Sequence, residues 1–180
     1  MKEDIKSVLL SEEQLEKITT KLGQTITEDY QNKRVLAVGL LKGSIVFMAD
    51  LIRKIDLPIE IDFMVASSYG DRTETSNMVQ IKKDIRKDLS GYHVLIVEDI
   101  IDSGNTLSCV KKLLESRNAE SVKICTLLDK PSRRQVKVEV DYVGAEVPDE
   151  FVVGYGLDYI DKYRNLPYLG VLSPSVYTRK

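Results

Sequence analysis

Short apolar runs alternate with helical hydrophobic patterns along most of the chain. The runs at 35–40 and 94–97 are each followed by small or polar residues and then by apolar residues at helical spacing. A further apolar run covers 122–128. Runs of this length are typical of strands that are buried on both faces, as in a parallel sheet. The pattern therefore predicts an α/β fold, a twisted parallel sheet flanked by helices.

Periodicity and turn residues predict the other elements. They are a helix that begins with a capping box at 11–14 and ends near 32, a helix over 45–52, a helix from 107 to about 118, and strands over 59–65, 78–85 and 136–144. The strand over 78–85 is expected at an edge of the sheet. The sequence contains no repeats, low-complexity segments or linkers, so we expect a single domain over residues 1–180.

Three carboxylates and a group of small polar residues separate the 94–97 strand from the next helix. The carboxylates, at the expected carboxyl end of the strand, are Glu98, Asp99 and Asp102, and the small residues are Ser103, Gly104, Asn105 and Thr106. Backbone N–H groups at a helix N-terminus, together with glycine and hydroxyl groups, form an anion site that suits a phosphate. Carboxylates beside it suit sugar hydroxyls and Mg²⁺. The alternative is acids that only cap the helix, but one Asp, Ser or Thr is enough for a cap.

A second strand–turn–helix unit follows the 35–40 run, with Lys42 and Gly43 in its turn. If the two strands are neighbours in the sheet, both turns face one crevice at the carboxyl ends of the strands. Lys42 or the amides beside it would then meet a second phosphate. The alternative is a lysine that is merely solvated in a surface turn.

The later part of the chain carries candidates for a base pocket. Lys130 stands just past the 122–128 strand, and Phe151 offers a flat apolar surface for stacking. An ammonium donor beside a stacking face selects an oxo group over an amino group, since two facing donors would stay unpaired. An apolar strand that only seals the core would leave the nearby Asp158 and Arg164 unexplained.

Overall charge and composition narrow the classes of partner. The 180 residues carry a net charge of −2, so neither nucleic acid nor a membrane is expected to bind through overall electrostatics. A phosphorylated ligand must then be held by local groups and a metal. The charged start of the chain, the lack of a long apolar window, and two cysteines inside apolar patterns, Cys109 and Cys125, predict a cytoplasmic protein with buried thiols.

Residues 98–106 resemble the ribose-phosphate motif of the type I phosphoribosyltransferases, two acids followed by a turn Asp-Ser/Thr-Gly-x-Thr. From the first helix to Pro167 the chain is similar to the hypoxanthine-guanine phosphoribosyltransferases, in particular those of bacteria. The resemblance implies their fold, with a small hood of N- and C-terminal segments over the sheet. It also implies purine salvage, in which the 5-phosphoribosyl group of phosphoribosyl pyrophosphate moves to hypoxanthine or guanine. Mg²⁺ as cofactor and a homodimer or homotetramer are further implications.

The resemblance gives each motif residue an expected role. Asp102 would act as general acid/base at N7 of the purine. The phosphoribosyl pyrophosphate site would consist of Lys42, Gly43, Glu98, Asp99, Asp102, Ser103, Gly104, Asn105, Thr106 and Arg164. The purine site would consist of Lys130, Phe151, Val152 and Asp158, and the metal ligands would be Glu98, Asp99 and Asp158. A lid would carry Ser68 and Tyr69, and a cis peptide bond would precede Lys42.

Three alternatives remain open at this point. A regulator that senses phosphoribosyl pyrophosphate without catalysis usually carries a basic surface or an extra nucleic-acid-binding domain. A transferase for adenine would place an amino group against the Lys130 donor, whereas xanthine is harder to exclude because backbone groups read its extra oxygen. A receiver-type signalling domain would need its acids on different strand ends. The residues do not rank hypoxanthine, guanine and xanthine against one another.

Overall fold

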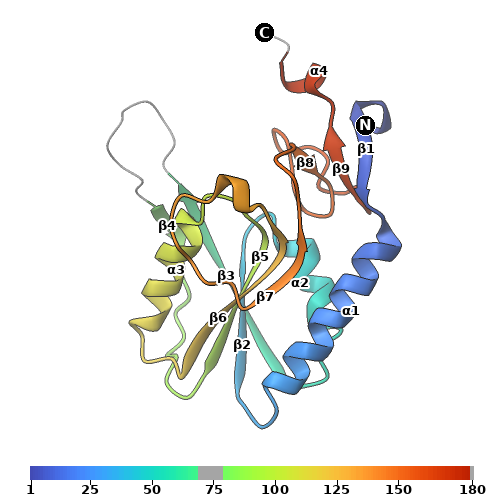
Figure 1. Ribbon diagram of the computed structural model, residues 1–180. Helices are drawn as coiled ribbons and strands as arrows, with labels where there is room; N and C mark the ends of the chain where they lie inside the picture. Colours follow the sequence, from blue (N-terminus) through green and yellow to red (C-terminus); the bar gives the residue numbers. More distant parts are fainter. Residues whose placement is uncertain (69–78, 179–180) are drawn as a thin grey trace.

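The computed structural model describes residues 1–68 and 79–178 (Figure 1). Its strands are β1 (Ile5–Leu10), β2 (Val35–Leu40), β3 (Ile59–Ser68), β4 (Val79–Lys83), β5 (His93–Ile101), β6 (Ser121–Asp129), β7 (Tyr142–Glu146), β8 (Val152–Val153) and β9 (Leu169–Leu172). Its α-helices are α1 (Glu12–Asp29), α2 (Ile45–Ile52), α3 (Asn105–Glu115) and α4 (Pro174–Tyr177), with 3₁₀ turns at Lys2–Asp4 and Pro131–Arg133.

Six strands of the described chain form the main sheet, in the order β4-β3-β2-β5-β6-β7. Strands β3, β2, β5, β6 and β7 are parallel, and β4 is an antiparallel edge strand beside β3. The chain leaves β2 toward β3 and later returns to place β5 on the other side of β2. The strand order therefore reverses between β2 and β5. In open α/β sheets a ligand crevice forms outside the carboxyl ends of the strands at such a point.

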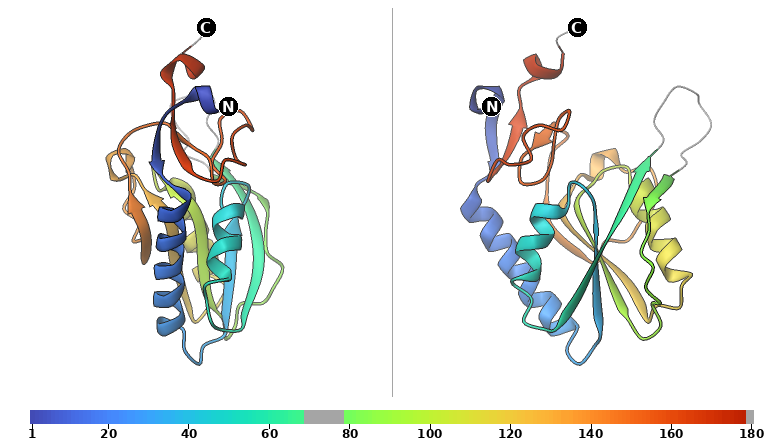
Figure 2. Two further views of the ribbon diagram at one scale, coloured as in Figure 1. Left: turned by 90° about the vertical axis from the view of Figure 1, so that its right-hand side faces the viewer. Right: turned by 180° about the vertical axis from the view of Figure 1, so that it is seen from behind.

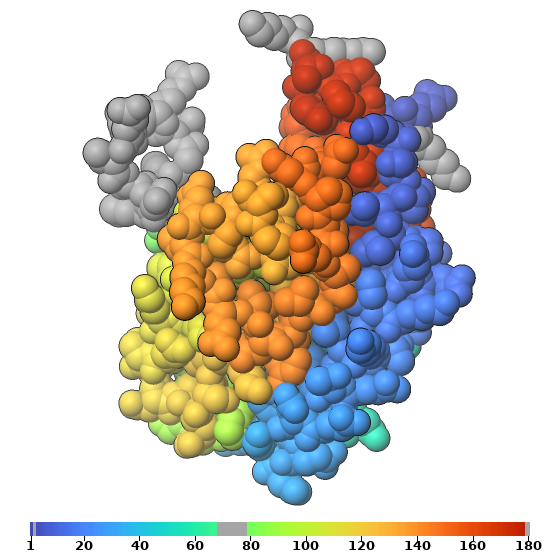
Figure 3. All heavy atoms as spheres, in the orientation of Figure 1, coloured from blue at the N-terminus to red at the C-terminus, as the bar shows by residue number. Residues whose placement is uncertain are grey.

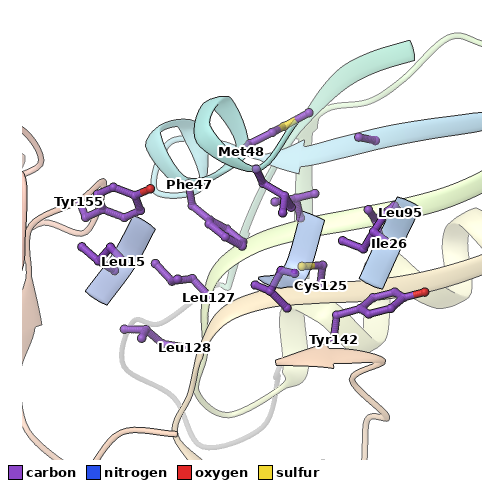
Figure 4. Packing of buried hydrophobic residues seen from close by; sticks show 14 of the residues in the cluster. Leu15, Ile26, Phe47, Met48, Leu95, Cys125, Leu127, Leu128, Tyr142 and Tyr155 are labelled. Carbon is purple, nitrogen blue, oxygen red and sulfur yellow. The ribbon is translucent and has the colours of Figure 1, made fainter. Parts of the chain in front are cut away.

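Helices cover both faces of the main sheet. Figure 1 shows α1 and α2 on one side and α3 on the other. Because side chains alternate along a strand, Val35 and Ala37 of β2 join the core under α1 and α2, while Leu36 and Val38 join the core under α3. Figure 4 shows Phe47 of α2 packed among residues of α1, β5 and β6. The predicted α/β class is thus confirmed.

A second sheet, with three strands in the described residues, forms a hood at one end of the molecule. Its order is β1-β9-β8, and both pairings are antiparallel. Figure 2 shows this sheet at the end of the molecule that also holds both chain termini. In Figure 3 the N-terminal segment (dark blue) and the C-terminal segment (red) lie against each other there. The hood that the resemblance implied is present.

Several expected element boundaries were wrong. Helix α1 ends at Asp29 and α3 at Glu115, both earlier than predicted, although the capping box of Ser11 and Gln14 is present. Strand β5 extends to Ile101, so Glu98 and Asp99 lie within it and only Asp102 follows it. Cys125 is buried as expected, whereas Cys109 is half-buried.

Residues 136–140 are not a strand, contrary to the prediction. Gln135 and Val136 donate their N–H groups to the Ser103 carbonyl, and the Asp141 carboxylate accepts the N–H of Ile124 at the edge of β6. Pairing of β6 with β7 starts only at Tyr142. Of the alternating valines, Val138 and Val140 are half-buried against the core under α3. The alternating apolar pattern therefore predicted the more buried positions correctly, but the segment forms no ladder of backbone hydrogen bonds with a neighbouring strand.

Among the described residues, none of the helices combines the length and the apolar character that a membrane-crossing helix needs.

An ion cluster joins the amino ends of three strands. Glu60 at the start of β3 accepts hydrogen bonds from Lys87, from Tyr92 Oη at 2.8 Å and from Arg34 Nη2 at 3.2 Å. The Lys87 ammonium, and after it the Tyr92 hydroxyl, lowers the pKa of Glu60 from 4.5 to about 2. The pKa is lowered in the folded state, so the unfolded state binds more protons between these two values. The stabilisation is therefore complete above pH 4.5 and is lost as the pH falls toward 2.

We expect Glu60→Gln to lower the urea midpoint of unfolding at pH 7 and to have a smaller effect at pH 3. Glu13→Gln serves as control because it breaks an exposed i,i+4 pair with Lys17 on α1. Such pairs contribute little to stability. Equal destabilisation by Glu60→Gln at both pH values would show that the ion cluster is not the source of the pH-dependent stability.

Candidate active site

The turn after β5 forms a hollow at the N-terminus of α3. Gly104 is the residue before the helix, and its φ of 84° is a left-handed conformation that favours glycine. The hollow, of about 220 Å³, is lined by Glu98, Ile100, Ile101, Asp102, Ser103, Gly104, Thr106 and Leu107. Within the described residues, no carboxylate caps α3: Gly104 precedes the helix, and Ser103 Oγ accepts the N–H of Asn105 at 3.3 Å. The positive end of the helix faces the hollow, which suits an anion.

Glu98 and Asp99 point to opposite sides of β5. Glu98 lines the hollow at α3, whereas Asp99 lies against Gly43 of the β2–α2 turn. Burial, and after it the neighbouring charge of Asp99, raises the pKa of Glu98 well above its usual value. Burial also raises the pKa of Asp99 to about 6, although backbone N–H groups and Arg164 oppose this effect. Both carboxylates therefore lie where a cation would stabilise their charge.

Gly43 is needed for the contact between the two turns of the crevice. A Cβ built on Gly43 would overlap Asp99 Oδ2 and lie 2.7 Å from Asp99 Cγ. The carbonyl of Gly43 in turn packs against Gly156 of the hood. The peptide bond between Leu41 and Lys42 is cis, as the resemblance implied. Any side chain at position 43 would push the turn and the carboxylate apart.

A second hollow, of about 410 Å³, lies between β5, β6 and the hood. It is lined by Ile100, Asp102, Lys130, Arg133, Asp149, Glu150, Phe151, Val152, Leu157, Asp158 and Tyr177. Lys130 directly follows β6, is 8% exposed and donates from Nζ to the Glu150 carbonyl at 2.9 Å. The ring of Phe151 stacks on Tyr177 with 5.3 Å between centroids and meets Tyr159 edge-on. The Lys130 ammonium and the aromatic rings thus share one hollow with Asp102, and its walls combine apolar side chains with charged ones.

A cluster of opposite charges lies beside this hollow. Arg164 Nη2 lies 2.6 Å from Asp158 Oδ1, and Arg164 Nη1 donates to the Gly156 carbonyl at 2.7 Å. Asp161 accepts from Lys42 at 2.9 Å and from Arg164 at 3.3 Å. Lys42, and after it Arg164, lowers the pKa of Asp161. The cluster connects the β2–α2 turn with the loop between β8 and β9.

Most of the predicted site residues therefore surround one crevice. Asp102 lines both hollows, and Asp158 connects the second hollow with the cluster of charges. Asn105 lines neither hollow, and its side chain donates to Gln135 instead. The expected lid lies outside the described residues at Tyr69, and the structure does not describe the side chain of Ser68. A larger hollow of about 980 Å³ lies between α1, α2 and the hood. Its lining includes no residue of the 98–106 motif.

Sequence reasoning missed several residues of this crevice, among them Ile100, Asp161 and Tyr177. Ile100 forms part of the wall shared by both hollows, and its place two residues after Glu98 in a strand was the available signal. Asp161 and Tyr177 carried no signal, because their partners lie far away in the sequence.

Known proteins are similar to this chain over nearly its whole length. Residues 7–160 match the family model described as phosphoribosyl transferase domain. The chain is 55% identical over 177 residues to the hypoxanthine-guanine phosphoribosyltransferase of Bacillus subtilis, a match that covers 98% of both chains. The chain belongs to the hypoxanthine-guanine phosphoribosyltransferase family.

Solved structures of the family have the same fold. A crystal structure of a hypoxanthine phosphoribosyltransferase from Staphylococcus aureus has a TM-score of 0.95 and 52% identity, and the match covers 99% of this chain and 97% of that one. A hypoxanthine-guanine phosphoribosyltransferase from Bacillus anthracis has a TM-score of 0.87 and 46% identity, with 93% and 98% covered. The chain therefore has the phosphoribosyltransferase fold that the resemblance implied.

The carboxylates of the crevice have the chemistry to hold a divalent cation such as Mg²⁺. One oxygen of Glu98, Oε2, is buried and accepts no hydrogen bond from any described residue. The described side chains form no group of three or more His, Cys, Asp or Glu suited to hold a metal alone. Mg²⁺ usually keeps waters and is bound by one or two carboxylates together with substrate phosphates. The buried and unpartnered Glu98 oxygen is a donor suited to that mode of binding.

Proposed function

We propose that this protein transfers the 5-phosphoribosyl group from phosphoribosyl pyrophosphate to hypoxanthine or guanine, with IMP or GMP and pyrophosphate as products. One observation carries the proposal: Asp102 stands where an anion hollow at α3 meets a hollow with an ammonium donor and an aromatic ring. A phosphorylated sugar in the first and a flat oxo base in the second would meet at this residue. The names of the relatives support this reaction as part of purine salvage.

In this proposal the α3 hollow binds the ribose 5-phosphate. The amides of residues 103–106 and the hydroxyls of Ser103 and Thr106 donate to the phosphate, and Glu98 and Asp99 accept from ribose hydroxyls. Gly43, Lys42 and Arg164 bind the pyrophosphate of the donor. The carboxylates also oppose the positive charge that develops on the ribose as pyrophosphate leaves, an electrostatic effect that is strong in a site shielded from water.

The purine lies in the second hollow. Lys130 donates to the 6-oxo group, Phe151 stacks on the ring, and Val152 contacts the base through its backbone. The carboxylate of Asp102 takes the proton from N7 as the purine nitrogen attacks the anomeric carbon, and the C–O bond to pyrophosphate breaks with inversion. Electrons of the broken bond leave with pyrophosphate, so no oxidant or reductant is needed.

Glu98 and Asp99 would hold Mg²⁺ in the ribose region, and Asp158 would bind a second Mg²⁺ through water. When bound, the metal neutralises charge on the pyrophosphate that leaves. Side chains of the protein orient the sugar and the base around it.

Two remaining parts of the proposal rest on the resemblance: a lid that carries Ser68 and Tyr69, and a homodimer or homotetramer. A single functional domain over 1–180 and a cytoplasmic location without nucleic-acid or membrane partners rest on the composition, net charge and cysteines of the sequence. The pairing of β1 with β9 supports the single domain, since it joins the two ends of the chain.

Lys130→Met tests the base donor, since methionine keeps the apolar stem and removes the ammonium. We expect kcat/KM for hypoxanthine to fall about ten- to hundredfold, the typical effect of a lost hydrogen bond from a charged group. KM for phosphoribosyl pyrophosphate should stay within about twofold, because Lys130 lines only the base hollow. Lys137→Met, an exposed residue outside both hollows, is the control. Unchanged use of hypoxanthine would remove Lys130 from the base site.

The reaction itself is tested by incubation of the protein with phosphoribosyl pyrophosphate, Mg²⁺ and each of adenine, guanine, hypoxanthine and xanthine. Nucleotide formation is followed by absorbance. We expect product from hypoxanthine or guanine and none from adenine. Binding of phosphoribosyl pyrophosphate without product from any purine would support a sensor instead.

A further inference from the structure

Asp161 places a carboxylate between the two cations that the proposed function assigns to pyrophosphate. One oxygen, Oδ1, lies 2.9 Å from Lys42 Nζ and 3.3 Å from Arg164 Nη2. Lys42 belongs to the β2–α2 turn, 119 positions away in the sequence. A single acceptor that bridges a lysine and an arginine has the arrangement that a phosphate oxygen adopts between such groups.

The loop holds Asp161 in place through its backbone. Its N–H donates to Asp158 Oδ2 at 2.8 Å. Ile160, Asp161 and Tyr163 all have left-handed backbone conformations, with φ of 51°, 55° and 76°. This conformation is unfavourable for most residues and is most accessible to Asn and Asp after glycine. The turn therefore directs the carboxylate toward the cations at some conformational cost.

The position of Arg164 does not depend on Asp161 alone. Arg164 is also held by Asp158 and by the carbonyl of Gly156. The side chains of Lys42 and Asp161 are 69% and 70% exposed. Ion pairs between exposed side chains are weak and easily exchanged. A ligand with several negative charges can thus replace this carboxylate without rearrangement of the site.

We propose that Asp161 is an internal counter-ion that occupies the pyrophosphate position in the free protein and gives way to the pyrophosphate group of the substrate. This inference rests on the proposed function and adds a determinant of affinity to the same site. Asp161 weakens binding of pyrophosphate in two ways: it must leave the cations, and its negative charge stays nearby. It thereby keeps the cations paired between turnovers and favours release of the product.

Asp161→Asn tests the proposal because asparagine keeps the shape of the side chain and tolerates the left-handed turn. Titration calorimetry measures the dissociation constant of pyrophosphate, with and without Mg²⁺. We expect the dissociation constant of pyrophosphate to be about three- to tenfold lower for Asp161→Asn than for the wild type, the scale of one exposed charge interaction. KM for phosphoribosyl pyrophosphate should fall in parallel, whereas KM for the base should not change. Glu13→Gln removes one charge from a comparably exposed pair on α1 and should leave all three values unchanged.

A double variant adds a stricter test. In a Lys42→Met background the replacement Asp161→Asn should have a smaller effect on pyrophosphate binding, since one of the two contested cations is gone. Equal or weaker binding of pyrophosphate by Asp161→Asn, with a wild type that binds it and forms nucleotide, would overturn the inference alone. A wild type that neither binds pyrophosphate nor forms nucleotide would overturn the proposed function as well.

Discussion

Asp102→Asn is expected to lower turnover by about two to four orders of magnitude, the usual loss when a general acid/base is removed. Asparagine has nearly the same shape as aspartate but cannot take the N7 proton. The carbonyl of Asp102 is held by Arg134 Nε at 3.1 Å, and the N–H groups of Gln135 and Val136 hold the next carbonyl, that of Ser103. The turn should therefore keep its conformation when the carboxylate is replaced. Binding of phosphoribosyl pyrophosphate, measured by calorimetry, should remain within about threefold of wild type.

Asp56→Asn is a suitable control for this variant, because it removes the same charge from an exposed turn between α2 and β3. Its turnover should equal that of the wild type. Near-normal turnover in Asp102→Asn would remove Asp102 from its role. Loss of turnover together with loss of donor binding would indicate that the residue holds the ribose phosphate rather than a proton.

Gly43→Ala is expected to lower kcat/KM for phosphoribosyl pyrophosphate by about a hundredfold or more. The added methyl group would overlap the Asp99 carboxylate, so either the β2–α2 turn or the carboxylate must move. Displacement of a positioning group by about 1 Å costs about that much in rate. Overpacking should also lower the free energy of unfolding by about 1–3 kcal/mol. Steady-state kinetics and urea unfolding measure the two effects.

Two companion variants separate a local clash from general destabilisation. Gly91→Ala places its methyl group in open space but at a φ of 77°, so it should lose about 1–2 kcal/mol of stability and keep full activity. Asp99→Ala removes the group that Gly43→Ala would strike. In that background the stability cost of Gly43→Ala should largely disappear. An undiminished cost there would place the clash elsewhere.

Local patterns predicted the strands and helices that surround the crevice. The apolar runs at 35–40 and 122–128 became β2 and most of β6, and the capping box correctly placed the start of α1. The prediction failed at 136–140, where alternating valines bury one side without forming a strand. Alternation reports which side chains are buried, whereas a strand also requires a neighbour with free backbone groups. Here the Asp141 carboxylate accepts the N–H of Ile124 at the edge of β6, and Gln135 and Val136 donate to the Ser103 carbonyl instead of to a strand.

The candidate site was predicted in its composition rather than in its arrangement. The residues 98–106 indicated a sugar-phosphate site because their chemistry is local to one turn. Their division over two sides of β5, with Glu98 toward α3 and Asp99 toward Gly43, followed only from the length of that strand. Boundaries of strands depend on pairing with neighbours, which a single sequence does not contain.

By itself, the sequence determined the α/β class, the turns that follow β2 and β5, and the family to which the chain belongs. These features depend on burial, backbone conformation and donor groups within short segments. Only the tertiary structure decided that β1 closes a hood with β9, that Gly43 touches Asp99, and that Asp161 lies between Lys42 and Arg164. Each of these contacts joins segments far apart in the chain. Their geometry is set by packing of the whole fold, and no local pattern of residues encodes it.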